Sequence, residues 1–278
     1  MDSFTPMQAD NTTYSGAIRG GWDLLKNQFK TLWPALLIFI LLLGIGFAIN
    51  SLLNFSAPTY VQLWRFPLFL WITLLDMGLF YLLAKSLTAQ PWHIGNLFWA
   101  FKRGEAWLLA LIYATIGSVL EAYSGMPIVQ PGQKLPADWF MHQQIWIMFI
   151  PLMLLGAFFG YVFMLYSAYG LNAKMSIVSS LGIFGGKLKW LFFPFILGAM
   201  LILVFIGVGI FFAIFFGILF FLVKYLGVML VGKIVLALLG VVLLIALEMA
   251  ILIWTFGSML IATGALMDMG SRHDRLVP

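Results

Sequence analysis

Two acidic residues, Asp76 and Glu248, lie in the middle of long apolar stretches and are the residues of this chain best placed to do chemistry inside a membrane. The first is in the stretch 66–83 and the second in the stretch 235–262. A charge at the centre of a bilayer costs about 2.5–3.5 kcal/mol or more, so an ionisable residue there indicates a functional site. No Lys or Arg lies near either residue along its stretch, so the loss of water favours the neutral carboxylic acid. Two such groups that meet can share a proton or hold a cation.

Two hydroxyl residues extend this candidate binding site. Thr255 and Ser258 follow Glu248 at helical spacing and share one face with Ala262, which makes a stripe of polar and small side chains. Two interpretations of Asp76, Glu248 and the stripe remain open. They form hydrogen bonds between packed helices, which average only about 0.6 kcal/mol in membranes but fix the register. Alternatively, they line a path for protons or cations.

The sequence gives no sign of an enzyme or of a metal site. It contains no cysteine, which excludes disulfides and thiolate ligands, and its three histidines lie far apart. There is no HExxH or GxSxG motif, and no Ser–His pair lies at membrane depth to supply a nucleophile and its base. We therefore predict a protein without catalytic residues, metal ion or cofactor.

The composition predicts an integral membrane protein. Of the 278 residues, 63% are hydrophobic and 9% are charged, whereas soluble domains are roughly 45–50% apolar and about 25% charged. The apolar stretches have the length of membrane-spanning helices rather than of barrel strands. The net charge of +5 does not predict nucleic-acid binding, because the basic residues flank the apolar stretches.

These observations predict an all-α membrane protein with six transmembrane helices arranged as three hairpins, each preceded by a cytoplasmic amphipathic helix in the membrane interface. The expected domains are a disordered tail (1–14), a single transmembrane domain (15–266) and a C-terminal tail (267–278) whose last three residues are similar to a protease site from an expression tag. The expected spans cover approximately residues 32–49, 66–83, 106–120, 145–168, 192–222 and 235–262. In the fifth span, Gly207 and Gly209 indicate a bend or a close approach of helices.

Three amphipathic stretches precede the hairpins and indicate an internal repeat. They are residues 16–30, 91–103 and 177–188, and the repeating units are 15–89, 90–171 and 174–266. In the first stretch, apolar side chains recur at the helical period and basic side chains lie on another face, as in helices of the membrane interface. The same stretches are candidates for contact with anionic lipid headgroups.

The distribution of basic residues predicts the orientation. With six spans and both termini in the cytoplasm, the outer segments hold only Arg65, Lys134, Lys224 and Lys233, and the other eleven of the 15 Lys and Arg residues lie inside. Cytoplasmic segments of membrane proteins carry this excess of positive charge. We therefore expect a multi-pass protein with its N- and C-termini in the cytoplasm.

Three segments resemble a known group of proteins. They are SGAIRGGWDLLKNQFKTLWPALLIFILLLG, NLFWAFKRGEAWLL and LNAKMSIVSSLGIFGGKLKWLFFPFIL. They are similar to a loose group of uncharacterised bacterial six-helix inner-membrane proteins, which is itself similar to the membrane domain of glycerophosphodiester phosphodiesterases. The resemblance implies the fold and a location in the bacterial inner membrane. It transfers no functional residues, and this chain has no catalytic phosphodiesterase domain attached.

Two functions follow from these features as hypotheses. The first is a non-enzymatic protein that acts as a scaffold, an assembly factor or a lipid-handling factor of the cell envelope, with membrane lipids and a membrane protein or a second copy of the chain as partners. The second is a small proton- or cation-coupled transporter that uses Asp76 and Glu248. A polar cavity that joins the two carboxylates favours the second hypothesis, and a dry bundle favours the first.

Overall fold

The computed structural model describes residues 13–56, 61–123, 143–186, 192–225 and 229–273. Over these residues the chain is helical and contains no strand, which confirms the predicted all-α class. The tail before residue 13, the expected polar loop 124–142 and the last residues 274–278 lie outside the described part.

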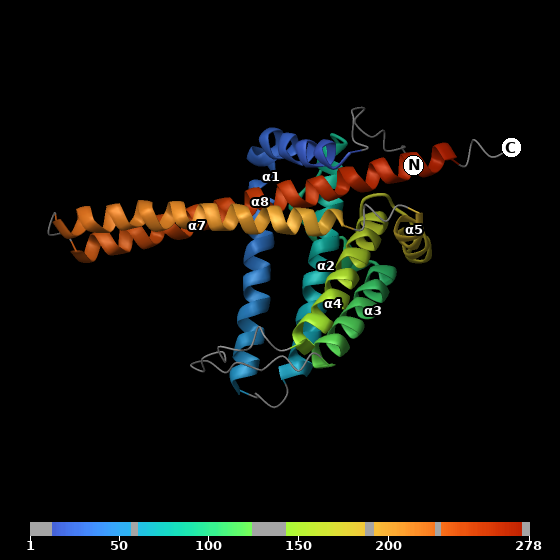
Figure 1. Cartoon of the computed structure of the whole chain (residues 1–278), viewed down its shortest axis with the longest axis horizontal. Helices are drawn as coiled ribbons and strands as arrows, with labels where there is room; N and C mark the ends of the chain where they lie inside the picture. The colour runs from blue at the N-terminus through green and yellow to red at the C-terminus, as the bar shows by residue number, and fades with distance from the viewer. Residues whose placement is uncertain (1–12, 57–60, 124–142, 187–191, 226–228, 274–278) are drawn as a thin grey trace.

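The first two helices form a hairpin. Helix α1 (Tyr14–Ser56) contains both the first amphipathic stretch and the first expected span, and helix α2 (Val61–Leu87) follows. Figure 1 shows that the first part of α1 lies across the molecule and that its second part runs alongside α2. Pro34 lies inside α1 and cannot donate the backbone hydrogen bond of an α-helix, so it is the residue suited to this change of direction.

The chain between α2 and the next helix is folded differently from the predicted amphipathic helix over 91–103. It forms two short 3₁₀ helices, η2 (Ile94–Phe98) and η3 (Ala100–Lys102). The Asn96 side chain starts the first of them, because its oxygen accepts the His93 N–H at 2.8 Å. Gly78 of α2 lets the backbone of Leu97 approach so closely that a Cβ atom there would lie 2.6 Å from the Leu97 carbonyl carbon.

Helices α3 (Gly104–Tyr123), α4 (Gln143–Ser167) and α5 (Ala173–Gly186) follow. Helices α3 and α4 pack against each other and against α2, and Figure 1 shows these three helices and the second part of α1 running in roughly the same direction. Gly170, with φ +68, makes the turn from α4 towards α5.

The last two helices, α7 (Phe193–Tyr225) and α8 (Met229–His273), form a hairpin that runs crosswise to α2, α3 and α4 and projects to one side beyond α1 (Figure 1). Helix α8 contacts α1, α2 and α4. Helix α7 is continuous through Gly207 and Gly209, and a Cβ atom added at either glycine meets nothing within 4 Å. The prediction of a bend or a close helix contact at these two glycines was therefore wrong. Helix α8 continues seven residues beyond the expected end of the domain at residue 266.

The first part of α1 packs along the second half of α8. Gly21 and Gly257 meet at this contact, and the Trp254 indole N–H donates to the Ile18 carbonyl oxygen at 3.3 Å. The first part of α1 therefore packs on another helix, in addition to any contact that it makes with the membrane interface. Paired glycines allow helices to approach closely in membranes.

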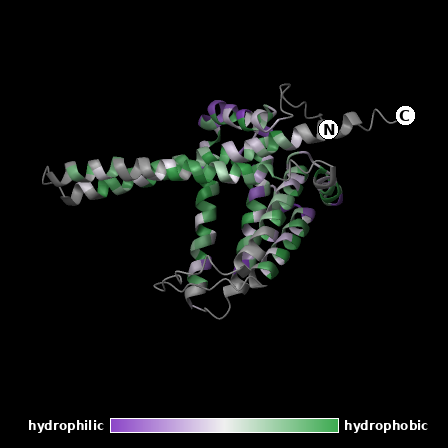
Figure 2. Ribbon diagram, viewed as in Figure 1, coloured by the Kyte–Doolittle hydropathy of each residue, from purple (hydrophilic) through white to green (hydrophobic). Residues whose placement is uncertain are grey.

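Three helical segments are long and apolar enough to cross a membrane, namely Tyr14–Leu53, Arg65–Leu87 and Ile234–Gly264. Four shorter apolar segments lie in the other described helices: Gly104–Leu120, Pro151–Ser167, Ala173–Ile183 and Phe193–Val204. Figure 2 shows hydrophobic residues along most of the helical surface and hydrophilic residues gathered in the first part of α1. The structure thus supports a multi-pass membrane protein.

Candidate functional site

Asp76 lies in the middle of α2, half-buried, on the side that faces α3. Its charge interacts with the phenol of Tyr113, whose ring packs against Phe159 and Phe163 at centroid distances of 5.1 and 5.5 Å. No basic side chain acts on Asp76 within the described part of the chain. Asp76 therefore lies near enough to α3 for its charge to act on the Tyr113 phenol.

Glu248 lies elsewhere. It is exposed on α8, and the contact between α2 and α8 occurs further along, where the Phe80 and Phe256 rings lie 4.8 Å apart. Glu248 precedes Phe256 by eight residues, about 12 Å along the helix axis, whereas Asp76 is one turn from Phe80. Because α2 and α8 run in different directions from this contact (Figure 1), it does not bring the two carboxylates together.

The two hydroxyl residues of the stripe have different surroundings. Thr255 donates to the carbonyl oxygen of Ile251 at 2.6 Å, and Ser258 donates to that of Trp254 at 2.7 Å. Ser258 is fully buried at the contact with Gly21 of α1 and has a packing role. Thr255 instead faces a pocket.

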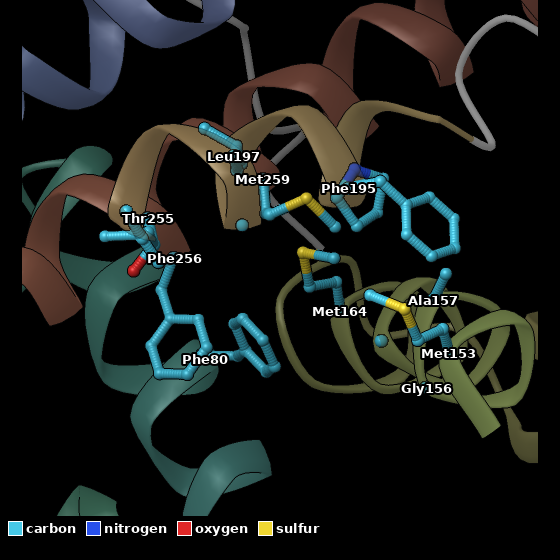
Figure 3. Close-up of a pocket in the computed structure, with 14 residues that line it drawn as sticks. Phe80, Met153, Gly156, Ala157, Met164, Phe195, Leu197, Thr255, Phe256 and Met259 are labelled. Atoms are coloured by element: carbon cyan, nitrogen blue, oxygen red, sulfur yellow. The ribbon is translucent and has the colours of Figure 1, made fainter. Parts of the chain in front are cut away.

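This pocket lies where the α7–α8 hairpin meets α2 and α4, and its volume is about 340 Å³ (Figure 3). Figure 3 shows the side chains of Met164 and Met259 facing each other across it. Its wall is made of aromatic, methionine, glycine and other small or apolar residues, with Thr255 as the single hydroxyl: Phe80, Met153, Gly156, Ala157, Gly160, Met164, Pro194, Phe195, Leu197, Gly198, Leu201, Thr255, Phe256 and Met259.

Three glycines keep the pocket open. A Cβ atom added at Gly156 or Gly160 of α4, or at Gly198 of α7, meets nothing within 4 Å. Each of these glycines therefore leaves space that a larger side chain would fill. Pro194 lies in the first turn of α7, where a proline needs no hydrogen-bond partner for its nitrogen.

The pocket is suited to an apolar ligand with an adaptable shape. Methionine side chains are flexible and polarisable, so they adjust to ligands of irregular outline. The hydroxyl of Thr255 already has an acceptor, so it requires no partner from a ligand. Among the described residues no three side chains of His, Asp or Glu lie together as metal ligands.

Sequence reasoning found Thr255 but missed the pocket. Gly156 and Gly160 are four residues apart on one helix face, and this spacing was the available signal. In an apolar helix the same spacing also occurs at close helix contacts, so it does not distinguish a void from a contact.

Comparisons of the chain with protein-family models, with characterised proteins and with solved structures gave no match. The resemblance to six-helix bacterial membrane proteins therefore stays a prediction.

Proposed function

We propose that this chain is a non-enzymatic integral protein of the bacterial inner membrane that handles lipids, as a scaffold or assembly factor of the cell envelope. The observation that supports this function best is the apolar pocket of about 340 Å³ between α2, α4, α7 and α8. Ligand pockets typically have volumes of about 300–1,000 Å³. The pocket is large enough for part of an acyl chain.

The pocket is open to its surroundings rather than sealed inside the protein, so an acyl chain of the bilayer has access to it. Lipid tails are as apolar as leucine, so the hydrophobic effect does not draw them out of the bilayer. Dispersion contacts favour a lipid tail in the pocket instead, because the side chains of the wall lose these contacts when the pocket is empty.

The proposal includes six spans arranged as three hairpins with both termini in the cytoplasm. Helices α1 and α2, α3 and α4, and α7 and α8 contact each other in pairs, which supports the hairpins. The outer parts of α7 and α8 expose large apolar side chains such as Leu203 and Val242, which favours a place in lipid. Helix α7 has 33 residues and is about 50 Å long, which exceeds the hydrocarbon core of about 30 Å. A strong tilt of α7 from the bilayer normal would accommodate this length.

The transporter hypothesis remains the alternative, and the half-buried Asp76, whose charge acts on the Tyr113 phenol, is the observation that favours it. The pocket supports it less, because neither Asp76 nor Glu248 lines it. Ion or proton flux into proteoliposomes that is lost in Asp76→Asn would favour the alternative over the lipid function.

The lipid function is tested by filling the pocket. Gly156→Leu and Gly198→Leu place a side chain in space that is open in the wild-type protein. Each protein is extracted in a mild detergent and its bound lipids are counted by native mass spectrometry. We expect the wild-type protein to retain lipid and both variants to retain several-fold less.

The matched control is Gly182→Leu on α5, where an added Cβ atom also meets nothing within 4 Å but which lies outside the pocket. This variant should retain as much lipid as the wild-type protein. Equal retention in all four proteins, or a wild-type protein without lipid, would contradict the proposed function.

A further inference from the structure

The wall of the apolar pocket contains three thioethers. Met153 and Met164 lie on one face of α4, because they are eleven residues or about three helical turns apart, and Met259 lies on α8. Figure 3 shows the Met164 and Met259 side chains facing each other, with Met153 on the α4 side of the pocket. A thioether sulfur is polarisable and is oxidised to a sulfoxide. The pocket therefore combines space for an apolar chain with groups that can reduce a peroxide.

The three methionines differ in how easily a ligand reaches them. Met153 has 38% of its surface exposed and Met259 has 8%, whereas Met164 has no exposed surface. The Met164 sulfur also lies 3.6 Å from the Thr263 hydroxyl oxygen, in a buried contact between α4 and α8. Met153 and Met259 are therefore the methionines that a ligand in the pocket can reach.

The single hydroxyl of the wall can accept a hydrogen bond from a ligand. A hydroxyl has one proton and two lone pairs. Thr255 donates its proton to the Ile251 carbonyl oxygen at 2.6 Å, so its oxygen meets a ligand as an acceptor. Thr255 precedes Met259 by four residues, and side chains at this spacing are neighbours on one face of a helix. A ligand O–H bound to Thr255 is thus held close to the Met259 thioether.

These features distinguish between lipids. An unmodified acyl chain has no hydrogen-bond donor and makes no use of the Thr255 oxygen. An acyl chain that carries a hydroperoxide has one O–H group, and burying such a group without an acceptor in apolar surroundings costs free energy. The oxidised chain therefore has an apolar part that suits the pocket, a donor for Thr255 and an oxygen atom that a neighbouring thioether can take.

We propose that the pocket binds the hydroperoxide of an oxidised acyl chain at Thr255 and that Met259 and Met153 reduce it. This inference rests on the proposed function and deepens it by naming the lipid class. The methionine sulfur attacks the terminal peroxide oxygen, so that an S–O bond forms, the O–O bond breaks and the hydroxyl proton passes to the departing alkoxide oxygen. The products are methionine sulfoxide and a hydroxylated acyl chain. The sulfur supplies both electrons, so each methionine reacts once and no other reductant is needed.

The test compares two oxidants on the same methionines. The protein in mild detergent is treated with a phosphatidylcholine hydroperoxide or with hydrogen peroxide, and the sulfoxide at each methionine is measured by peptide mass spectrometry. Met175 of α5, with 48% of its surface exposed, lies outside the pocket and is the reference. Hydrogen peroxide should oxidise Met175 more than Met259, because it follows exposure. The lipid hydroperoxide should reverse this order several-fold.

Two substitutions of Thr255 test the acceptor. Thr255→Val removes the hydroxyl at nearly the same size and should lower the oxidation of Met259 by the lipid hydroperoxide several-fold, whereas Thr255→Ser should retain most of it. Oxidation of Met259 by hydrogen peroxide shows that access to the pocket is unchanged. A Thr255→Val protein that reacts like the wild-type protein would overturn the proposal. The comparison of the two oxidants on the wild-type protein is decisive even if this variant fails to fold, because an equal ratio of Met259 to Met175 oxidation with both oxidants would also overturn it.

The products separate this inference from the proposed function. The amount of hydroxylated phosphatidylcholine formed should equal the amount of methionine sulfoxide formed with the lipid hydroperoxide. A wild-type protein that retains lipid but forms neither product would overturn the inference and leave the lipid function standing. Binding of the hydroperoxide and of the corresponding hydroxylated lipid without any sulfoxide would assign the pocket to hydroxylated chains and overturn the reduction step. A wild-type protein that retains no lipid at all would overturn both.

Discussion

The close contact between α1 and α8 predicts a large effect of one added methyl group. Gly21 faces α8, and a Cβ atom there would lie 2.6 Å from the Trp254 carbonyl oxygen and 2.8 Å from the Ser258 nitrogen. It would also overlap the Ser258 side-chain oxygen. Because two of these atoms are backbone, they cannot rotate away, so Gly21→Ala must push the helices apart.

The magnitude follows from two opposed terms. Alanine in place of a helical glycine gains up to about 1 kcal/mol of helix propensity. Overpacking costs about 1–3 kcal/mol, and contact with backbone atoms places this site at the upper end. We therefore expect Gly21→Ala to lower the free energy of unfolding by about 2 kcal/mol. For a chain of this size that corresponds to a fall in melting temperature of roughly 4–8 °C.

The assay is thermal unfolding in detergent, monitored by intrinsic tryptophan fluorescence. Two other glycines of α1 provide the control variants. At Gly20 the added atom would lie 2.7 Å from Cδ1 of Ile261, the end of a flexible side chain that can move aside, so Gly20→Ala should change the melting temperature little. At Gly44 it meets nothing within 4 Å, and Gly44→Ala should be neutral or slightly stabilising. If Gly21→Ala and Gly44→Ala have the same melting temperature, the close contact between α1 and α8 at Gly21 is contradicted.

Three further predictions concern other contacts. Gly78→Ala should lower the melting temperature as much as Gly21→Ala, because the added atom would meet backbone atoms of Leu97; equal melting of Gly78→Ala and the wild-type protein would contradict this. Asp76→Asn should leave lipid retention unchanged in native mass spectrometry, because Asp76 does not line the pocket; a several-fold loss would link this residue to lipid binding. The Tyr169 hydroxyl donates to the Leu260 carbonyl oxygen at 2.9 Å, and burial raises its pKa above the usual value. The stabilisation of the folded protein by this neutral hydroxyl is therefore complete below about pH 10 and is lost as the pH rises towards the pKa of the folded state. Tyr169→Phe should therefore cost about 0.5–1.5 kcal/mol at neutral pH and flatten the alkaline loss of stability seen in a pH series of melting temperatures.

The helices themselves were predictable from the sequence. The expected span 106–120 lies within α3, and the expected span 145–168 nearly coincides with α4, because long apolar stretches of this length can satisfy their backbone groups only as helices in lipid. The amphipathic stretch 91–103 was predicted less well. Its apolar spacing is helical, but the side chain of Asn96 binds the backbone locally and gives short 3₁₀ turns instead.

The arrangement of the helices was not predictable in the same way. A hydrophobic pattern identifies the face that a helix buries only when another face is polar, and α7 is apolar on all sides. The crossing of the α7–α8 hairpin over the other helices depends on contacts between distant residues, such as Gly21 with Gly257. Single residues of this kind give no periodic signal.

Of the candidate site, only the two carboxylates could be identified from the sequence. Asp76 and Glu248 were identified because a carboxylate in an apolar stretch is costly, but that cost does not say whether two such residues meet. Gly156 and Gly198 border an open space, whereas Gly21 touches a neighbouring helix, and all three look alike in sequence. The pocket is thus a property of the packing of four helices.

The most direct test of lipid binding in the pocket is photo-crosslinking with a phospholipid that carries a diazirine in its acyl chain. The protein is reconstituted with this lipid, irradiated and digested, and the labelled peptides are identified by mass spectrometry. We predict strong labelling of the pocket residues Met153, Met164 and Met259, and a several-fold loss of that label in Gly198→Leu, with the label on the exposed Leu203 of α7 unchanged. Pocket residues labelled no more than Leu203, or a label that Gly198→Leu does not reduce, would contradict the account.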